Sequence, residues 1–216
     1  MLLPAAMPDA MPDAGPGVGW RAVTAPPHRL LVITDTTSAA RPLVAQVELA
    51  LQGGPFALIL RDKHLPWPRR LALAAELGPL LDDAGASLLV ADPLGPVPMA
   101  HLSSDFPVPA PRPRVVGRSV HAGQRIDPGL DYITYSPIWP VESKPGYGPA
   151  LGARGLAERA RTSPVPVYAL GGVTGPDRAR AARVAGAAGV AVQGAVMRAS
   201  DPAAVVADLR AALDSD

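Results

Sequence analysis

The sequence predicts an α/β fold, a compact single-domain (β/α)8 barrel, from three observations. Short apolar runs of strand length alternate with longer amphipathic stretches from Arg29 onward. Eight such runs can be counted before the C-terminus of the 216-residue chain, which suits a small TIM barrel. Most runs are apolar along their length, and all turn polar or to glycine at their C-terminal ends. In a barrel of this kind those ends converge on one face, where the active site is built.

The strand candidates follow one another in the order that a barrel requires. They are LLVITD at 30–35, FALILR at 56–61, SLLVAD at 87–92, MAHLSS at 99–104, RVVGRS at 114–119, DYITYS at 131–136, PVYALG at 166–171 and GVAVQG at 189–194. Near-continuous apolar runs are typical of parallel strands that are covered on both faces. Parallel strands in turn need crossover connections, which are usually helices.

Helical spacing supplies most of those crossovers. It is found at 42–51, 68–84, 151–161, 176–185 and 202–213, several with proline near the start and glycine after the end. The segment 105–114 holds four prolines and is expected to be an extended loop. An open doubly wound sheet is the structural alternative, but the chain lacks a GxGxxG turn, and such a sheet would not gather eight strand ends in one ring.

Composition excludes several classes of function. With 20 basic and 19 acidic residues and only 4% aromatic residues, the chain suits neither bulk-charge binding nor base stacking of nucleic acid. The absence of cysteine excludes disulfides and thiol catalysis and fits a cytoplasmic location. No apolar run is long enough for a membrane helix. Residues 1–27, broken by prolines, are expected to form a disordered or extended tail, and residues 28–216 the barrel.

Charged residues at the predicted rim suggest an anion site and a metal site. Arg61 and Lys63 leave the second strand and could clamp a phosphate or diphosphate, although a solvated loop is the alternative. Asp92 and Asp105 follow the third and fourth strands and are candidate ligands for Mg²⁺, although aspartates often only cap loops.

Small residues at the ends of the last two strands suggest a second anion site. Gly171 and Gly172 follow the seventh strand, and Gln193 and Gly194 follow the eighth. Barrels often bind phosphate there through backbone N–H groups and a short helix. Tight packing is the alternative reason for glycine at these positions.

The chain also resembles a known family, from about Arg29 to the C-terminus. The resemblance lies in LLVITD, LILRDK, LLVAD, HLSSDFP, GRSVH, DYITYSPIWPVESKPG, VPVYALGGV and AGAAGVAV, in family order and with family-like spacing. They are similar to the thiamine-phosphate synthase and TenI family, small TIM barrels of thiamine biosynthesis. For a synthase, the resemblance implies joining of hydroxymethylpyrimidine diphosphate to a thiazole phosphate, with Mg²⁺ as cofactor and release of pyrophosphate.

The resemblance also implies roles for individual residues. The diphosphate contacts would be Arg61 and Lys63, the metal ligands Asp92 and Asp105, and the loop after the sixth strand would add Ser143 and Lys144. Ser119 would contact substrate, and Gly171, Gly172, Gln193 and Gly194 would hold the thiazole phosphate. Three positions depart from the family pattern by replacing polar residues with apolar ones: Ile59, Ala91 and Val141.

Two further functions remain open at this point. His121 lies where TenI-like proteins carry a histidine for proton transfer, which would suit a thiazole tautomerase. A histidine satisfied by loop hydrogen bonds is the alternative for that residue. A barrel that binds thiazole phosphate or thiamine phosphate without turnover would tolerate the three apolar replacements. Small molecules are the expected partners, without nucleic acid or membrane, and homo-oligomerisation is left open.

Overall fold

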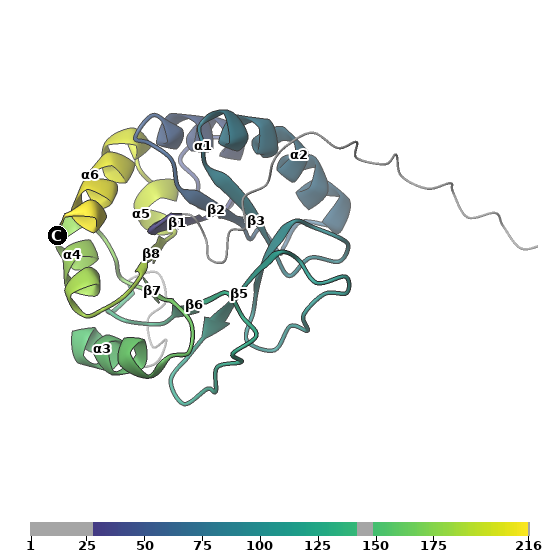
Figure 1. Ribbon diagram of the computed structural model, residues 1–216. Coiled ribbons are helices and arrows are strands. Elements are labelled where there is room, and N and C mark those ends of the chain that lie inside the picture. Colours follow the sequence, from purple (N-terminus) through teal and green to yellow (C-terminus); the bar gives the residue numbers. More distant parts are fainter. Residues whose placement is uncertain (1–27, 142–148, 216) are drawn as a thin grey trace, which may run out of the picture.

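The computed structural model describes residues 28–141 and 149–215 and contains a closed barrel of parallel strands (Figure 1). The strands pair in the order β1 to β8, and β8 pairs with β1. This confirms the predicted fold class. The strands are β1 Leu30–Ile33, β2 Ala57–Leu60, β3 Ser87–Ala91, β4 Met99–Leu102, β5 Val115–Val120, β6 Tyr132–Tyr135, β7 Val167–Leu170 and β8 Gly189–Val192.

Each of the five predicted helical segments is a helix, with ends within one residue of those expected. The helices are α1 Leu43–Leu51, α2 Trp67–Asp83, α3 Gly152–Thr162, α4 Pro176–Val184 and α6 Pro202–Asp214. One further helix, α5 Gly194–Met197, follows β8. It was not predicted from helical spacing, because it is a single turn. Proline near the start of α2, α4 and α6 fits the first helical turn, where its missing N–H leaves no bond unmade.

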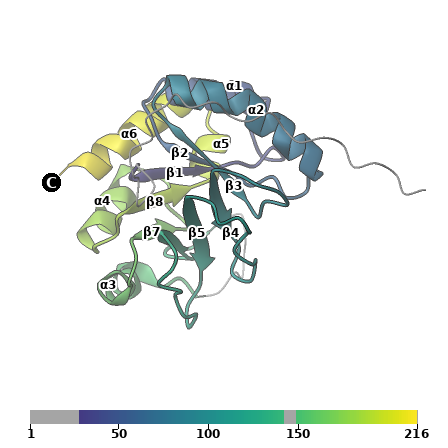
Figure 2. The ribbon, with the colours of Figure 1, turned by 45° about the vertical axis from the view of Figure 1, so that its right-hand side comes forward.

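One arc of the barrel has no helices. The connections between β3 and β4, β4 and β5, and β5 and β6 are irregular, and all three belong to the described part of the chain. Figures 1 and 2 show helices around the remaining strands and only loops beside β4 and β5. The predicted proline-rich loop at 105–114 is confirmed. Side-chain contacts fix this arc, among them Arg118 donating to the carbonyls of Ser103 and Ser104.

Side chains alternate between two apolar cores, which explains why the strands read as continuous apolar runs. Within β1, Leu31 and Ile33 point into the barrel, while Leu30 and Val32 pack outward against the helices. The barrel interior holds two of the chain's few aromatic side chains, Tyr132 and Tyr168.

A glycine in the middle of β5 makes room for one of these rings. A Cβ at Gly117 would lie 2.0 Å from Cζ of Tyr132, so this strand needs a residue without a side chain. The ring of Tyr132 therefore fills the space over the β5 backbone.

The remaining expectations about chain organisation concern segments outside this description. The predicted tail at 1–27 and the predicted site residues Ser143 and Lys144 lie outside the described residues. Among the residues that are described, no helix is long and apolar enough to cross a membrane.

Candidate active site

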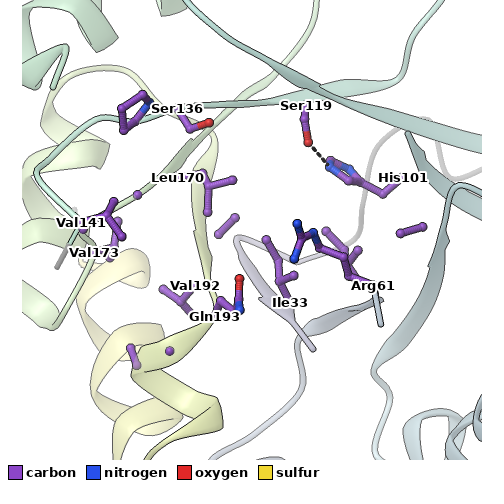
Figure 3. Close-up of a pocket in the computed structure, with 18 of the residues that line it drawn as sticks. Ile33, Arg61, His101, Ser119, Ser136, Val141, Leu170, Val173, Val192 and Gln193 are labelled. Atoms are coloured by element: carbon purple, nitrogen blue, oxygen red, sulfur yellow. Dashed lines mark hydrogen bonds between the residues drawn. The ribbon is translucent and has the colours of Figure 1, made fainter. Parts of the chain in front are cut away.

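A cavity of about 420 Å³ opens at the C-terminal ends of the strands (Figure 3). Its apolar lining comes from strand residues that point into the barrel, including Ile33, Ile59, Ala91 and Ala191. Polar and charged side chains stand around this lining, most of them on the loops and helices that follow the strands, with His101 and Ser119 on β4 and β5 themselves. The site therefore has the position expected of an active site in this fold.

Most of the predicted site residues come together in this cavity. Those that line it are Arg61, Lys63, Ser119, His121, Gly171, Gly172, Gln193 and Gly194. Asp92 does not line the cavity itself, but it contacts Lys63 and Ser103, which do line it. Asp105 is exposed on the loop after β4 and does not line the cavity. All three apolar replacements line the cavity: Ile59, Ala91 and Val141.

The charge of the cavity wall has one sign. Arg61 and Lys63 follow β2, Arg178 lies in the first turn of α4, and Arg198 follows α5. Among the described lining residues there is no aspartate or glutamate. The four cations form two groups, one after β2 and one after β7 and β8, and β1 lies between them in the ring of strands. A wall of this kind attracts anionic ligands.

Lys63 is held by the carboxylate of Asp92. Lys63 Nζ pairs with Asp92 Oδ2 and lies 3.2 Å from the Ser103 hydroxyl. The backbone N–H and the hydroxyl of Ser103 donate to the two oxygens of Asp92 at 2.7 and 2.5 Å. Burial opposes ionisation, but the hydrogen bonds from Lys63 and Ser103 outweigh it and hold the pKa of Asp92 below its usual value. The carboxylate is therefore charged and orients Lys63 at the cavity mouth.

The backbone at Asp92 is strained but strongly fixed. Its φ of 39° is in the left-handed region, the only non-glycine instance among the described residues. The buried side chain of Arg70 donates to the carbonyls of Ala91 and Asp92, and the Asp92 N–H donates to the carbonyl of His101. Strain of this kind persists where surrounding contacts over-determine the backbone, and it is frequent at functional sites.

The carboxylate of Asp92 fits a magnesium ion only as a single protein ligand. Among the described residues, no group of three or more His, Asp or Glu side chains comes together to hold a metal. Mg²⁺ commonly takes one or two carboxylates and completes its shell with water and substrate phosphates. Asp92 suits that arrangement, whereas the exposed Asp105 is not brought to the cavity.

Asp62, the acid between the two cations after β2, has a structural role. Its carboxylate accepts the Thr34 hydroxyl and the Thr36 N–H, each at 2.5 Å. Asp62 is buried, while Arg61 and Lys63 on either side of it reach the cavity. The carboxylate therefore ties the end of β1 to the end of β2 and fixes where the two cations begin.

The glycines after β7 allow a close approach of two backbones. Gly171 and Gly172 have φ of 96° and 68°, and a Cβ at Gly172 would lie 2.6 Å from the carbonyl oxygen of Pro140. Arg178 donates to the Gly172 carbonyl and stands 5.8 Å from the ring centre of Trp139. Tight packing therefore explains these glycines, and the same turn forms part of the cavity wall.

The turn after β8 brings a glutamine and an arginine to the site. Gln193 donates its amide N–H to Asp35 at 2.6 Å. Burial disfavours charge on Asp35, but hydrogen bonds from Thr37, Ser38 and Gln193 outweigh it and keep the pKa of Asp35 below its usual value. Because a carboxylate only accepts, the Gln193 amide oxygen is left to face other partners. A Cβ at Gly194 would lie within 2.4 Å of the Arg198 guanidinium, so glycine lets Arg198 fold over the turn.

A buried polar chain crosses the strand ends on the β4 to β6 side. The two ring nitrogens of His101 lie 2.9 Å from the Tyr132 hydroxyl and 3.0 Å from the Ser119 hydroxyl, and the second bond is drawn in Figure 3. Burial lowers the pKa of His101 to about 3, and the charges of Lys63, Arg61 and Arg118 act in the same direction against the opposing effect of Asp92. Burial also raises the pKa of Tyr132 well above its ordinary value. Both side chains are therefore uncharged near neutral pH.

His121 lies at the mouth, beside the end of β6. Its Nδ1 is 3.1 Å from the Ser136 carbonyl oxygen and 3.3 Å from the Ser136 hydroxyl. The carbonyl can accept a proton from Nδ1 in one ring tautomer, and the hydroxyl can donate to Nδ1 in the other, so Ser136 orients the ring in either form.

The side chains of the cavity that were missed from the sequence include His101, Arg178 and Arg198. His101 lies in the family-like HLSSDFP segment, and inward alternation along β4 could have placed it inside the barrel. Arg178 lies in the predicted helix at 176–185, and Arg198 lies between the eighth strand and the predicted helix at 202–213. Their position soon after the ends of β7 and β8 is the signal, because the start of each βα unit faces the active-site end.

The closed barrel, with a cationic cavity at the C-terminal ends of its strands, defines the protein as a TIM-barrel enzyme whose site suits anionic ligands. A family model described as thiamine monophosphate synthase matches residues 30–196. The chain belongs to the thiamine monophosphate synthase/TenI family, which confirms the resemblance found in the sequence.

Individual relatives cover most of the chain. A thiamine-phosphate synthase of a Roseiflexus species is 38% identical over 201 residues, 85% of this chain and 84% of its own. One from Salinibacter ruber is 34% identical over 202 residues, 86% of this chain and 88% of its own. Among solved structures, the thiamine phosphate pyrophosphorylase of Pyrococcus furiosus has a TM-score of 0.72 and 26% identity, covering 86% of this chain and 95% of that one.

Proposed function

We propose that the protein is a thiamine-phosphate synthase that joins hydroxymethylpyrimidine diphosphate to a thiazole phosphate and releases pyrophosphate. The observation that carries the proposal is the arrangement of the four cations. Arg61 and Lys63 on one side suit a diphosphate, and Arg178 and Arg198 on the other suit a monophosphate. Two anionic substrates need two such groups, whereas an isomerase acting on one phosphate needs one.

In this reaction the main catalytic task of the protein is to stabilise the leaving group. The bond between the pyrimidine methylene carbon and the diphosphate oxygen breaks, and its electron pair leaves with pyrophosphate. The thiazole ring nitrogen then donates its lone pair to the methylene carbon, which forms the new C–N bond. Arg61 and Lys63 stand where they can balance the departing negative charge, and Asp92 holds Lys63 in place.

The apolar cavity lining serves the same chemistry. Ile33, Ile59 and Ala91 exclude water from the space between the two cation groups, so that water competes less with the thiazole nitrogen for the methylene carbon. Asp92 would hold Mg²⁺, which would supply further positive charge to the leaving group. The cytoplasmic location stays a prediction.

A product assay with separate omissions tests the proposal. Purified protein is incubated with both substrates and Mg²⁺, and thiamine phosphate and pyrophosphate are measured. We expect equal amounts of the two products, and loss of both when either substrate is omitted or when excess chelator is added. Absence of thiamine phosphate under the complete conditions, with both substrates shown to bind, would overturn the synthase assignment in favour of a binding protein.

A second candidate, the thiazole tautomerase, is favoured by the geometry of His121. The carbonyl and the hydroxyl of Ser136 both contact His121 Nδ1 and orient the ring where it lines the cavity. Tautomerisation requires removal of a proton at one thiazole position and its return at another, and a positioned histidine can do both.

Replacement of His121 separates the two candidates. In a synthase, His121→Asn should change turnover less than tenfold, because charge stabilisation lies at Arg61 and Lys63. In a tautomerase, the variant should still bind thiazole phosphate but lose exchange of solvent deuterium into it. The measurement is deuterium incorporation by mass spectrometry, beside synthase turnover. Exchange at the wild-type rate in the variant would remove His121 as the base.

A further inference from the structure

The polar chain of Tyr132, His101 and Ser119 determines which way hydrogen bonds run at one edge of the cavity. The three side chains come from β6, β4 and β5, which are consecutive in the barrel, and Figure 3 shows the His101–Ser119 end at the cavity. Tyr132 is fully buried and His101 nearly so, whereas Ser119 lines the cavity. A neutral imidazole has one donor nitrogen and one acceptor nitrogen, so the protons of the chain can be arranged in two ways.

In the first arrangement every buried group is satisfied. The Tyr132 hydroxyl donates to His101 Nδ1, and His101 Nε2–H donates to the Ser119 oxygen. The fully buried Thr134 lies 3.5 Å from both His101 Nε2 and the Ser119 oxygen, and its hydroxyl donates to the Ser119 oxygen. Because the Ser119 oxygen then accepts from both neighbours, its own proton is directed to the cavity.

In the second arrangement a buried hydroxyl proton has no acceptor. His101 Nδ1–H would donate to the Tyr132 oxygen, and the Ser119 hydroxyl would donate to Nε2. In the described part of the chain, His101 supplies the only hydrogen bond to the Tyr132 hydroxyl. An unmade bond at a fully buried hydroxyl is unfavourable, so the first arrangement is preferred.

We propose that Tyr132 and His101 are positioning residues that fix the Ser119 hydroxyl as a hydrogen-bond donor to an acceptor atom on the uncharged ring of a bound substrate. Ser119 lies on the same side as Lys63, whose Nζ reaches Ser103 at the end of β4. Under the proposed function, the ring on that side belongs to the pyrimidine diphosphate, and its ring nitrogens are acceptors of the required kind. The proton arrangement itself does not depend on the proposed function.

The glycine in β5 is part of this device. A Cβ at Gly117 would lie 2.5 Å from the Tyr132 hydroxyl oxygen and 2.1 Å from the ring, which would move the hydroxyl away from His101. Gly117 and Ser119 point inward from the same strand, two residues apart, so β5 both admits Tyr132 and presents Ser119. The Tyr132 hydroxyl is thus placed by packing, before any ligand binds.

Nitrogen NMR of the histidine ring tests the arrangement without any assay of activity. In protein labelled with ¹⁵N-histidine at neutral pH, we expect His101 as the Nε2–H form with an unprotonated Nδ1 that accepts a hydrogen bond. Its signals are assigned by their absence in His101→Gln. Tyr132→Phe should move the Nδ1 resonance towards that of a nitrogen with no hydrogen bond. A wild-type ring protonated at Nδ1, or an Nδ1 resonance unchanged in Tyr132→Phe, would overturn the proposal.

Tyr168→Phe is the matched control. Tyr168 lies in the same interior, with its ring centre 5.5 Å from that of Tyr132, but its hydroxyl donates to the backbone carbonyl of His28 instead. The control removes the same atom from the same core and should leave the His101 resonances in place. A shift of equal size in both variants would mean a general effect of core packing and would count against the proposal.

Kinetics of a double variant test the link to substrate. Tyr132→Phe should raise KM for the pyrimidine diphosphate several-fold and leave KM for the thiazole phosphate within twofold. In a Ser119→Ala background the same substitution should have no further effect, because Tyr132 acts through Ser119. Additive losses would show an independent structural role and overturn the positioning role. Confirmed NMR shifts in a protein without synthase turnover would contradict the proposed function and leave the proton arrangement intact.

Discussion

Replacement of Lys63 by alanine is expected to lower synthase turnover by about 10²–10³-fold. Loss of one preorganised hydrogen-bond donor to a developing anion has an effect of this size in enzymes. Lys63 lines the cavity, and its charge is oriented by Asp92 and Ser103. The lysine acts on the departing diphosphate more strongly than on the bound substrate, so the loss should fall mainly on kcat. Steady-state kinetics with both substrates varied measure the effect.

The matched control for this variant is Arg69→Ala. Arg69 is an exposed cation at the start of α2, and it does not line the cavity. The Arg69→Ala variant also loses one positive charge from this region, but outside the cavity. Its turnover should therefore stay within about twofold of wild type. Thermal unfolding of both variants shows whether they are folded. Wild-type turnover in a folded Lys63→Ala protein would remove Lys63 from the mechanism.

Stability is expected to fall steeply with acid because of His101. Burial lowers the pKa of this ring to about 3, whereas an unfolded histidine titrates near 6.5. Below pH 6.5 the histidine is therefore protonated in the unfolded chain but not in the folded protein. The free energy of unfolding decreases as the pH falls towards 3. The slope contributed by His101 approaches about 1.4 kcal/mol per pH unit, with a total of at most about 5 kcal/mol.

Urea unfolding between pH 5 and 7 measures this contribution. The free energy of unfolding should rise with pH in the wild type and rise less steeply in His101→Gln. Burial and the charge of Arg210 also lower the pKa of His28, which adds a slope of the same sign to both proteins, so only the difference reports on His101. Identical slopes in the wild type and in His101→Gln would exclude the buried neutral ring.

The sequence determined the barrel and its helices closely, because both depend on local patterns. The apolar runs and the prolines near helix starts are read directly from the chain, as at Pro176 and Pro202. Arg61 and Lys63 were predicted because two cations directly follow an apolar run, at the strand end where a barrel builds its site. These features need no knowledge of distant contacts.

The rest of the site depends on contacts between segments that are far apart in the chain. Nothing local shows that Asp92 pairs with Lys63, or that His101 joins Tyr132 and Ser119 across three strands. Asp105 illustrates the converse, since its position after β4 resembles that of a ligand, yet the irregular loop leaves it exposed. The expected metal role of Asp105 stays a prediction without support from its position.

The proline-rich connection between β4 and β5 reduces the number of backbone N–H groups that need a hydrogen-bond partner, which a helix would instead satisfy internally. An irregular segment lying over a barrel brings backbone N–H groups towards an apolar surface, where water is scarce and partners are few. In residues 105–114, four of the ten positions are proline and have no N–H to satisfy. Prolines also restrict the unfolded chain, so ordering this segment costs less entropy than ordering an equally long flexible loop. The barrel therefore replaces a helix in this arc by a connection that has fewer N–H groups to satisfy and less conformational entropy to lose on folding.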